Sequence, residues 1–168
     1  MKISKTILAS LLFALAGVTS AQQTAQPARP PAQVPQAAQP LTPAQQELVA
    51  RQDAEIAKAA AWVVQNVDRN NAAEVWRGAS AVAKNAVTEQ AFVAQLSQDR
   101  QKLGAITQRQ QIAITRAVYP AGGQVPAGKY VNVAYATKFA NAAQPVRELV
   151  SFHLDDDKVW RMSGYSVR

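Results

Sequence analysis

The sequence contains no cysteine in its 168 residues, which excludes disulfide bonds, thiolate metal sites and a lipid anchor on cysteine. Its single histidine, His153, has no evident partner for a metal site or a Ser/His/Asp arrangement. The acidic run Asp155–Asp157 lacks the alternating D-x-D-x-D-G spacing of a calcium loop, and the glycines lie in no phosphate-binding motif. We therefore expect neither a metal nor a cofactor.

Long hydrophobic runs are scarce as well. Ile7–Val18 is an apolar stretch of 12 residues, shorter than the ~20 that a membrane-spanning helix needs, and no second such run follows. Lys2 and Lys5 precede it, and the small residues Thr19–Ala21 follow it. This order is typical of a secretory signal peptide. We expect a signal peptide over residues 1–21, a periplasmic or secreted protein, and no membrane-spanning segment.

The next segment, residues 22–44, is rich in proline, glutamine and alanine. It holds six of the nine prolines and a single charged residue, Arg29. Such a composition buries too little apolar surface to offset the entropy of ordering the chain, and its prolines favour an extended conformation. We interpret it as a disordered tether. Recognition of its prolines by another domain is the alternative, although no clear P-x-x-P motif with a basic flank stands out.

Residues 45–168 are long enough for one domain with a hydrophobic core. Removing Lys2, Lys5 and Arg29 from the 18 basic residues leaves 15 against 11 acidic ones, a net charge of +4. The arginines of this region are scattered, whereas a nucleic-acid-binding domain would gather them on one stripe. We expect no nucleic-acid partner.

Three helices are predicted in the first half of the domain. Thr42-Pro43-Ala44-Gln45 has the form of a capping box with proline at the first helical position, and apolar residues at helical spacing continue to about Asp68. A shorter helix is predicted over residues 72–83. A third begins after Thr88 and ends at Gly104, which suits a left-handed helix stop.

The second half alternates polar and apolar residues, as strands do. Strands are predicted around residues 112–118 and over residues 129–140, 146–154 and 159–167. The last two connections are short, so neighbouring strands should pair antiparallel. The predicted fold is α+β, with three N-terminal helices packed on one face of a curved four-stranded antiparallel meander.

Several short motifs within this domain resemble one bacterial family. They are Ala60-x-Trp62, Val67-Asp68, Trp76, Arg100-x-x-Leu103-Gly104, Arg109, "YVNVAYATKFAN" and "KVWRMSGYSVR". Together they are similar to the family called domain of unknown function 4019, over essentially all of residues 45–168. The resemblance implies an exported α+β domain, similar in layout to the cone-shaped folds of nuclear transport factor 2, with no established activity and no catalytic residue to carry over.

A polar row is predicted within the more apolar face of the sheet. If Asp156-Asp157 form the last turn, Glu148 lies opposite Tyr165, and pairing of Phe139 with Val146 would place Thr137 on the other side of Glu148. An isolated ionised carboxylate on such a face would be strongly destabilising. The candidate ligand-binding residues are Thr137, Glu148, Arg161, Ser163 and Tyr165.

Two explanations of this row remain open. In the structural one, Glu148 pairs with an arginine, either Arg109 or Arg100. In the functional one, the open end of the cone forms a pocket in which Glu148 and Tyr165 orient a small polar ligand. An enzyme of the same fold could use Glu148 as a general base beside the Tyr165 hydroxyl.

The opposite, mixed face of the sheet is predicted to carry the candidate partner contacts His153, Trp160 and Met162. We expect an exported, non-catalytic binding or interaction module whose partner is a small polar ligand or an envelope protein. The alternatives are the small enzyme using Glu148, and a structural envelope protein that self-associates, for example as a homodimer through Trp160 and Met162 of the sheet.

Overall fold

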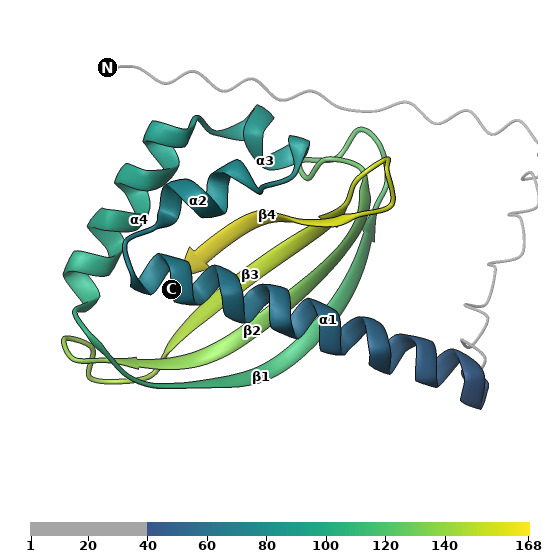
Figure 1. The fold of residues 1–168 in the computed structure, drawn as a ribbon, viewed down its shortest axis with the longest axis horizontal. Coiled ribbons are helices and arrows are strands. Elements are labelled where there is room, and N and C mark those ends of the chain that lie inside the picture. Colours follow the sequence, from purple (N-terminus) through teal and green to yellow (C-terminus); the bar gives the residue numbers. More distant parts are fainter. Residues whose placement is uncertain (1–39) are drawn as a thin grey trace, which may run out of the picture. The chain divides into compact units, whose positions relative to one another are not determined.

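The computed structural model describes residues 40–168, in which helices precede a four-stranded antiparallel sheet (Figure 1). The predicted α+β class is confirmed. The helices are α1 (Pro43–Asp68), α2 (Ala72–Arg77), α3 (Ala81–Ala86) and α4 (Glu89–Leu103), and the strands are β1 (Ile106–Tyr119), β2 (Gly128–Phe139), β3 (Val146–Leu154) and β4 (Trp160–Val167). The predicted signal peptide and the tether up to residue 39 lie outside the described residues.

Helix α1 begins at the predicted capping box. The Thr42 hydroxyl accepts a hydrogen bond from the Gln45 N–H at 3.3 Å, and the Gln45 side chain accepts one from the Thr42 N–H at 2.9 Å. The helix thus starts at Pro43, two residues before the boundary of 45 expected for the domain. Within residues 40–168, no helix combines the length and apolarity needed to cross a membrane.

The helix predicted over residues 72–83 is instead two short helices, and this prediction is wrong. The Ser80 N–H donates to the Met162 carbonyl of β4 at 2.8 Å, and the Ser80 hydroxyl accepts from the Ala83 N–H at 3.3 Å. Because Ser80 is fully buried and makes both bonds, it starts α3 as a new helix and attaches it to the sheet.

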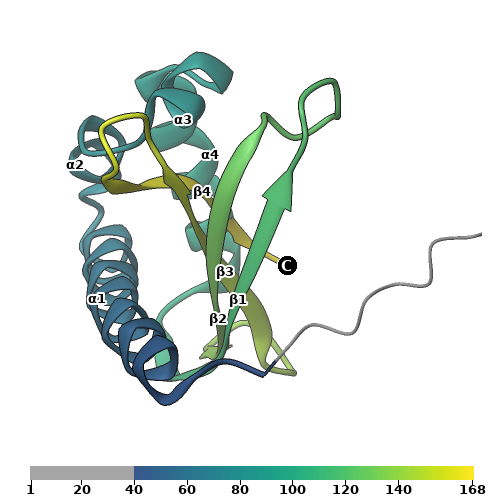
Figure 2. The ribbon, with the colours of Figure 1, turned by 90° about the vertical axis from the view of Figure 1, so that its right-hand side faces the viewer.

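The strands lie in the order β1-β2-β3-β4, with every neighbouring pair antiparallel. For residues 40–168, Figure 2 shows the helices on one side of this sheet and none over the other. The core between the two layers joins the inner face of α1 to the central strands. Its most buried members include Ala60, Val63, Val75, Val131, Val133 and Val150.

The predicted pairing of β3 with β4 is wrong. The turn between them shifts the register, so that Leu154 lies opposite Trp160 and Phe152 opposite Met162. A further irregularity between Ser151 and Phe152 brings Val150 opposite Tyr165. Since a one-residue shift moves a side chain to the other face, Trp160 and Met162 lie on the helix side, where they contact the core.

Candidate functional site

A fully buried carboxylate lies at the centre of the polar row. Glu148 of β3 has no exposed surface, yet its two oxygens accept four hydrogen bonds. Arg109 of β1 donates from Nε to Oε2 at 2.7 Å and from Nη2 to Oε1 at 3.0 Å. The Thr137 hydroxyl donates to Oε2 at 2.7 Å, and the Tyr165 hydroxyl donates to Oε1. The burial of this charge is therefore compensated on both oxygens.

Arg109 links Glu148 to the end of α1. Its Nη1 donates to Asp68 Oδ2 at 2.7 Å, and its Nη2 donates to Asp68 Oδ1 at 3.0 Å. Burial lowers the pKa of Arg109, but hydrogen bonds and charge interactions with Asp68 and Glu148 outweigh it and raise that pKa above its ordinary value. This guanidinium therefore stays charged between two carboxylates, a geometry that its planar fork allows.

Arg100 of α4 extends the network to a second cation. Its Nη2 lies 3.2 Å from Asp68 Oδ1, and its guanidinium carbon lies 4.7 Å from the centre of the Phe139 ring. Its other terminal nitrogen, Nη1, is buried and has no hydrogen-bond partner among residues 40–168. Three ion pairs thus join four side chains in the order Arg100, Asp68, Arg109 and Glu148. Their charges alternate in sign and sum to zero.

Two tyrosines adjoin this network. Burial, together with the charge of Glu148 and the hydrogen bond to it, raises the pKa of Tyr165 well above its ordinary value, although Arg100 and Arg109 act in the opposite direction. Burial likewise raises the pKa of Tyr135, whose hydroxyl has no partner within the described part of the chain. Both phenols are therefore neutral near pH 7, and Tyr165 acts as a donor to Glu148.

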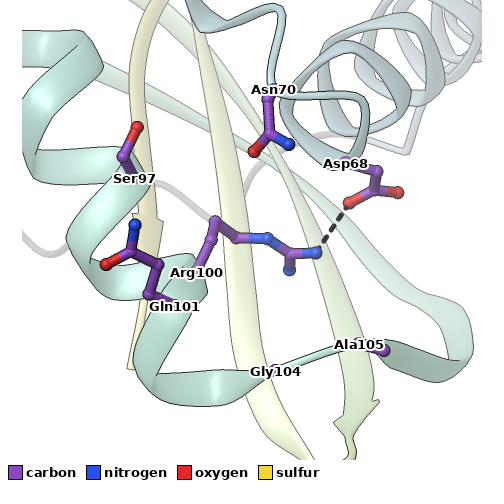
Figure 3. Close-up of a pocket in the computed structure, with 7 residues that line it drawn as sticks. All are labelled: Asp68, Asn70, Ser97, Arg100, Gln101, Gly104 and Ala105. Carbon is purple, nitrogen blue, oxygen red and sulfur yellow. Dashed lines mark ion pairs between the residues drawn. The ribbon is translucent and has the colours of Figure 1, made fainter.

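A cavity of about 470 Å³ opens beside Arg100, between the end of α1 and the last turns of α4. Figure 3 shows the Arg100 side chain reaching from α4 to Asp68, with Asn70 above it and with Ser97 and Gln101 on its own helix. The residues that line the cavity are Asp68, Asn70, Ser97, Arg100, Gln101, Gly104 and Ala105. The wall therefore offers a guanidinium, a carboxylate, two amides and a hydroxyl.

Gly104 fixes the path of the chain at the floor of this cavity. It ends α4 with φ at 76°, a left-handed conformation that side chains disfavour. A Cβ at this position would lie 2.9 Å from the Asn141 side-chain nitrogen, which donates to the Lys102 carbonyl at 3.2 Å. Glycine adopts this backbone without strain and leaves Asn141 in place, so the predicted helix stop at Gly104 has a conformational reason.

The structure brings together three of the five predicted ligand-binding residues, namely Thr137, Glu148 and Tyr165. The predicted opposite pairs are wrong, because Thr137 lies opposite Val146 and Glu148 opposite Val167. All three side chains still meet, since a shift of two residues keeps a side chain on its face. Of the two arginines proposed as partners for Glu148, Arg109 makes the contact.

Arg161 and Ser163 are not part of this row. Arg161 instead pairs with Asp155 at 3.1 Å and with Asp157 at 2.7 Å across the β3–β4 turn. Ser163 lines a separate hollow with residues such as Asn132 and Leu149, and its buried hydroxyl has no partner among residues 40–168. The altered register accounts for both placements.

The three predicted partner contacts are divided between the two faces. His153 is nearly buried, with its Nδ1 at 2.8 Å from Asp155 Oδ1 and its ring 4.9 Å from that of Tyr130. Met162 is only 4% exposed and Trp160 packs against the core. Their predicted place on the outer face is wrong, so neither side chain forms the outer surface on which a homodimer was expected.

Asp68, Arg100 and the cavity between them were not predicted as a site. The short motifs on which the family resemblance rests include Asp68, Arg100 and Arg109. Their presence in these motifs was the sequence feature that could have pointed to the site. Nothing in their spacing brings them together, because they come from a helix end, a second helix and a strand. Within residues 40–168, no group of three or more histidine, aspartate or glutamate side chains is placed to hold a metal ion.

Comparison with known proteins agrees with the motif resemblance. The family model described as Protein of unknown function (DUF4019) matches residues 58–165. No curated protein and no solved structure gives a significant match, so the similarity to the cone-shaped folds of nuclear transport factor 2 stays a prediction. The match covers α1 from its middle onward and almost all of the sheet. Because it spans more than half of the chain, the chain belongs to the family of domain of unknown function 4019.

Proposed function

We propose that this domain is an exported, non-catalytic binding module that holds a small polar ligand in the cavity beside Arg100. The observation that carries the proposal is the Arg100 Nη1 group, a buried guanidinium donor without a partner among residues 40–168, on a residue that lines a cavity of about 470 Å³. The sequence pattern of residues 1–21 supports export.

The chemistry of the cavity wall favours a ligand with a hydrogen-bond acceptor, such as a carboxylate or a sugar oxygen. A buried donor left without a partner destabilises the protein. Nη1 has no accessible surface of its own, so a ligand acceptor would relieve that penalty only once the Arg100 side chain turns toward the cavity. Asn70, Ser97 and Gln101 add groups that both donate and accept. Since Asp68 already opposes the charge of Arg100, we expect hydrogen bonds rather than net charge to select the ligand.

The contacts of Glu148 argue against its use as a general base. A general base must reach the proton that it removes, whereas Glu148 has no exposed surface and accepts four hydrogen bonds. Tyr165, the proposed orienting group, is committed to the same carboxylate. An enzyme using this pair would first have to separate Glu148 from Arg109. The carboxylate in the cavity wall, Asp68, is held by Arg100 and Arg109.

A thermal-shift screen with glucuronate, citrate, phosphate and diglycine as probes tests this proposal. A ligand at ~100 times its dissociation constant adds ~2.7 kcal/mol of stability, which should raise the melting temperature by several degrees. The Arg100→Lys and Gln101→Ala variants should lose the response. Gln98→Ala is the matched control, because Gln98 is an exposed amide on the same helix that does not line the cavity.

The proposal fails if no acceptor-bearing probe shifts the melting temperature of the unmodified protein. It also fails if a shift survives in both Arg100→Lys and Gln101→Ala, because the ligand would then bind elsewhere. Gln101→Ala separates loss of binding from loss of fold, since Gln101 is exposed and makes no hydrogen bond to another side chain within the described residues.

A further inference from the structure

A second cavity lies at the opposite end of the sheet from Arg100. It measures about 430 Å³ and lies between α1 and the ends of the strands, near the loops that join β1 to β2 and β3 to β4. These two loops lie at the same end of the sheet in Figure 1. Pairing of Tyr119 with Gly128 marks this end, whereas pairing of Ile106 with Phe139 marks the end near the Arg100 cavity.

The floor of this second cavity is apolar. Val131 is almost completely buried, and Trp160 packs beside it against the core. Leu154 lies opposite Trp160 in the β3–β4 pair, and Val118 lies near the mouth with 73% of its surface exposed. These side chains give the cavity an apolar lining, which is unfavourable to leave in contact with water.

Three cations surround this apolar floor, namely Arg116, Lys129 and Lys158. Arg116 is already paired, with its Nη2 2.6 Å from Asp53 Oδ1 and 3.0 Å from Gln52 Oε1. Neither lysine forms an ion pair within the described part of the chain. The mouth of the cavity thus carries a surplus of two positive charges.

The backbone of Lys158 adds an independent observation. Lys158 has φ at 65°. This left-handed conformation is unfavourable for most residues with a Cβ and is adopted mainly by glycine and, less often, by asparagine. Its N–H donates to the Asp155 carbonyl at 2.9 Å, which closes the β3–β4 turn. Glycine would form this turn with less backbone strain, so the needs of the turn do not account for a lysine at this position.

We propose that this second cavity binds a single-chain anionic amphiphile of the fatty-acid class. The acyl chain lies on Val118, Leu154 and Trp160, above the buried Val131, and the carboxylate lies between the ammonium groups of Lys129 and Lys158. Apolar burial supplies the attraction for the chain, and charge complementarity orients the head group. The proposal is independent of the Arg100 cavity.

Calorimetric titration of the purified protein with decanoate, below its micelle concentration, tests the inference. One molecule should bind per chain. Lys129→Gln and Lys158→Gly should each weaken binding about fivefold, the effect of removing one partly exposed ion pair. Lys138→Gln is the matched control on the same strand as Lys129, and it should leave decanoate binding unchanged. The neutral analogue decanol and the short acid propionate should both bind more weakly.

Lys158→Gly also separates a binding role from a structural one. Glycine accepts the left-handed backbone, so the melting temperature of this variant should rise while its affinity for decanoate falls. The inference would be overturned if Lys129→Gln and Lys158→Gly both bind decanoate as tightly as the unmodified protein. It would also be overturned if Lys138→Gln weakens decanoate binding as much as these two variants do. Binding to anionic phospholipid vesicles without binding of monomeric decanoate would also overturn it, because it would indicate a membrane surface rather than a site for one chain.

Discussion

Arg109 donates to Glu148 at 2.7 and 3.0 Å and to Asp68 at 2.7 and 3.0 Å, so one guanidinium ties the end of α1 to the centre of the sheet. The two carboxylates come from segments far apart in the sequence. Both the helix layer and the sheet layer therefore depend on one side chain, and changes at either carboxylate should affect the stability of the whole domain.

Replacing Glu148 by glutamine should lower the free energy of unfolding by about 3–5 kcal/mol, because it leaves Arg109 without one of its charge partners in a buried site. Urea unfolding followed by tryptophan fluorescence measures the loss. Glu55→Gln is the control, since Glu55 pairs with Lys58 on an exposed surface of α1, and it should change stability by less than about 1 kcal/mol. A Glu148→Gln variant as stable as the unmodified protein would contradict the buried network.

Arg109→Lys should also destabilise the protein, although the charge is retained. A lysine ammonium cannot bridge two carboxylates as the planar fork does, and the loss of two or more charge-assisted hydrogen bonds should cost about 2–4 kcal/mol. The matched change Arg116→Lys acts on a pair with Asp53 that is about one-third exposed, and it should cost less than about 1 kcal/mol. Equal losses in the two variants would show that the geometry at Arg109 has no special importance.

The raised pKa of Tyr165 predicts a loss of stability at alkaline pH. In the unfolded chain a tyrosine releases its proton near pH ~10, whereas the folded protein retains it. The folded state then binds more protons than the unfolded state, so the free energy of unfolding falls as the pH rises above ~10 and is unaffected by this group at lower pH.

Tyr165→Phe tests the alkaline effect directly. Urea midpoints measured from about pH 8 to about pH 11 should fall less steeply in this variant than in the unmodified protein. Near pH 7 the variant should be less stable by about 1.5–3 kcal/mol, since it loses a hydrogen bond to a charged group. Parallel pH profiles for the two proteins would contradict the assignment of the alkaline effect to Tyr165.

Gly128→Ala should destabilise the start of β2. Gly128 has φ at 148°, and a Cβ there would lie 2.2 Å from His153 Nε2. Either the backbone or the His153 ring must move, which should cost about 1–3 kcal/mol. Gly123→Ala is the control, because its nearest neighbours would lie at 3.8 and 3.9 Å, and its effect should stay within about 0.5 kcal/mol. A His153→Ala background should reduce the loss if the ring causes it.

The fold could be predicted where local chemistry decides the structure. The Thr42 capping box, the Thr88 cap and the Gly104 stop all lie where the sequence placed them, and β3 has its predicted ends. The break at Ser80 was missed because its cause is a hydrogen bond to the distant Met162 carbonyl. No local pattern contains that contact.

The candidate site could be predicted only in part. Thr137, Glu148 and Tyr165 share a face, and the alternation of side chains along strands was enough to group them. Arg161, Trp160 and Met162 were placed on the wrong faces, because the β3–β4 register depends on a turn that holds Lys158 in a left-handed conformation. The Arg100 cavity depends on how helices pack on the sheet, which sequence periodicity does not specify.

We propose that Arg100 binds a ligand and that the network of Asp68, Arg109 and Glu148 behind it stabilises the fold. The most direct test is an NMR titration that follows the side-chain Nε–Hε signal of Arg100 and the side-chain amide of Gln101 as glucuronate, citrate, phosphate and diglycine are added in turn. We predict that at least one of these compounds shifts both signals in a saturable way and leaves the Arg109 Nε–Hε signal almost unchanged. The claim would be contradicted if no compound shifts the Arg100 signal, or if saturable shifts occur only elsewhere in the protein.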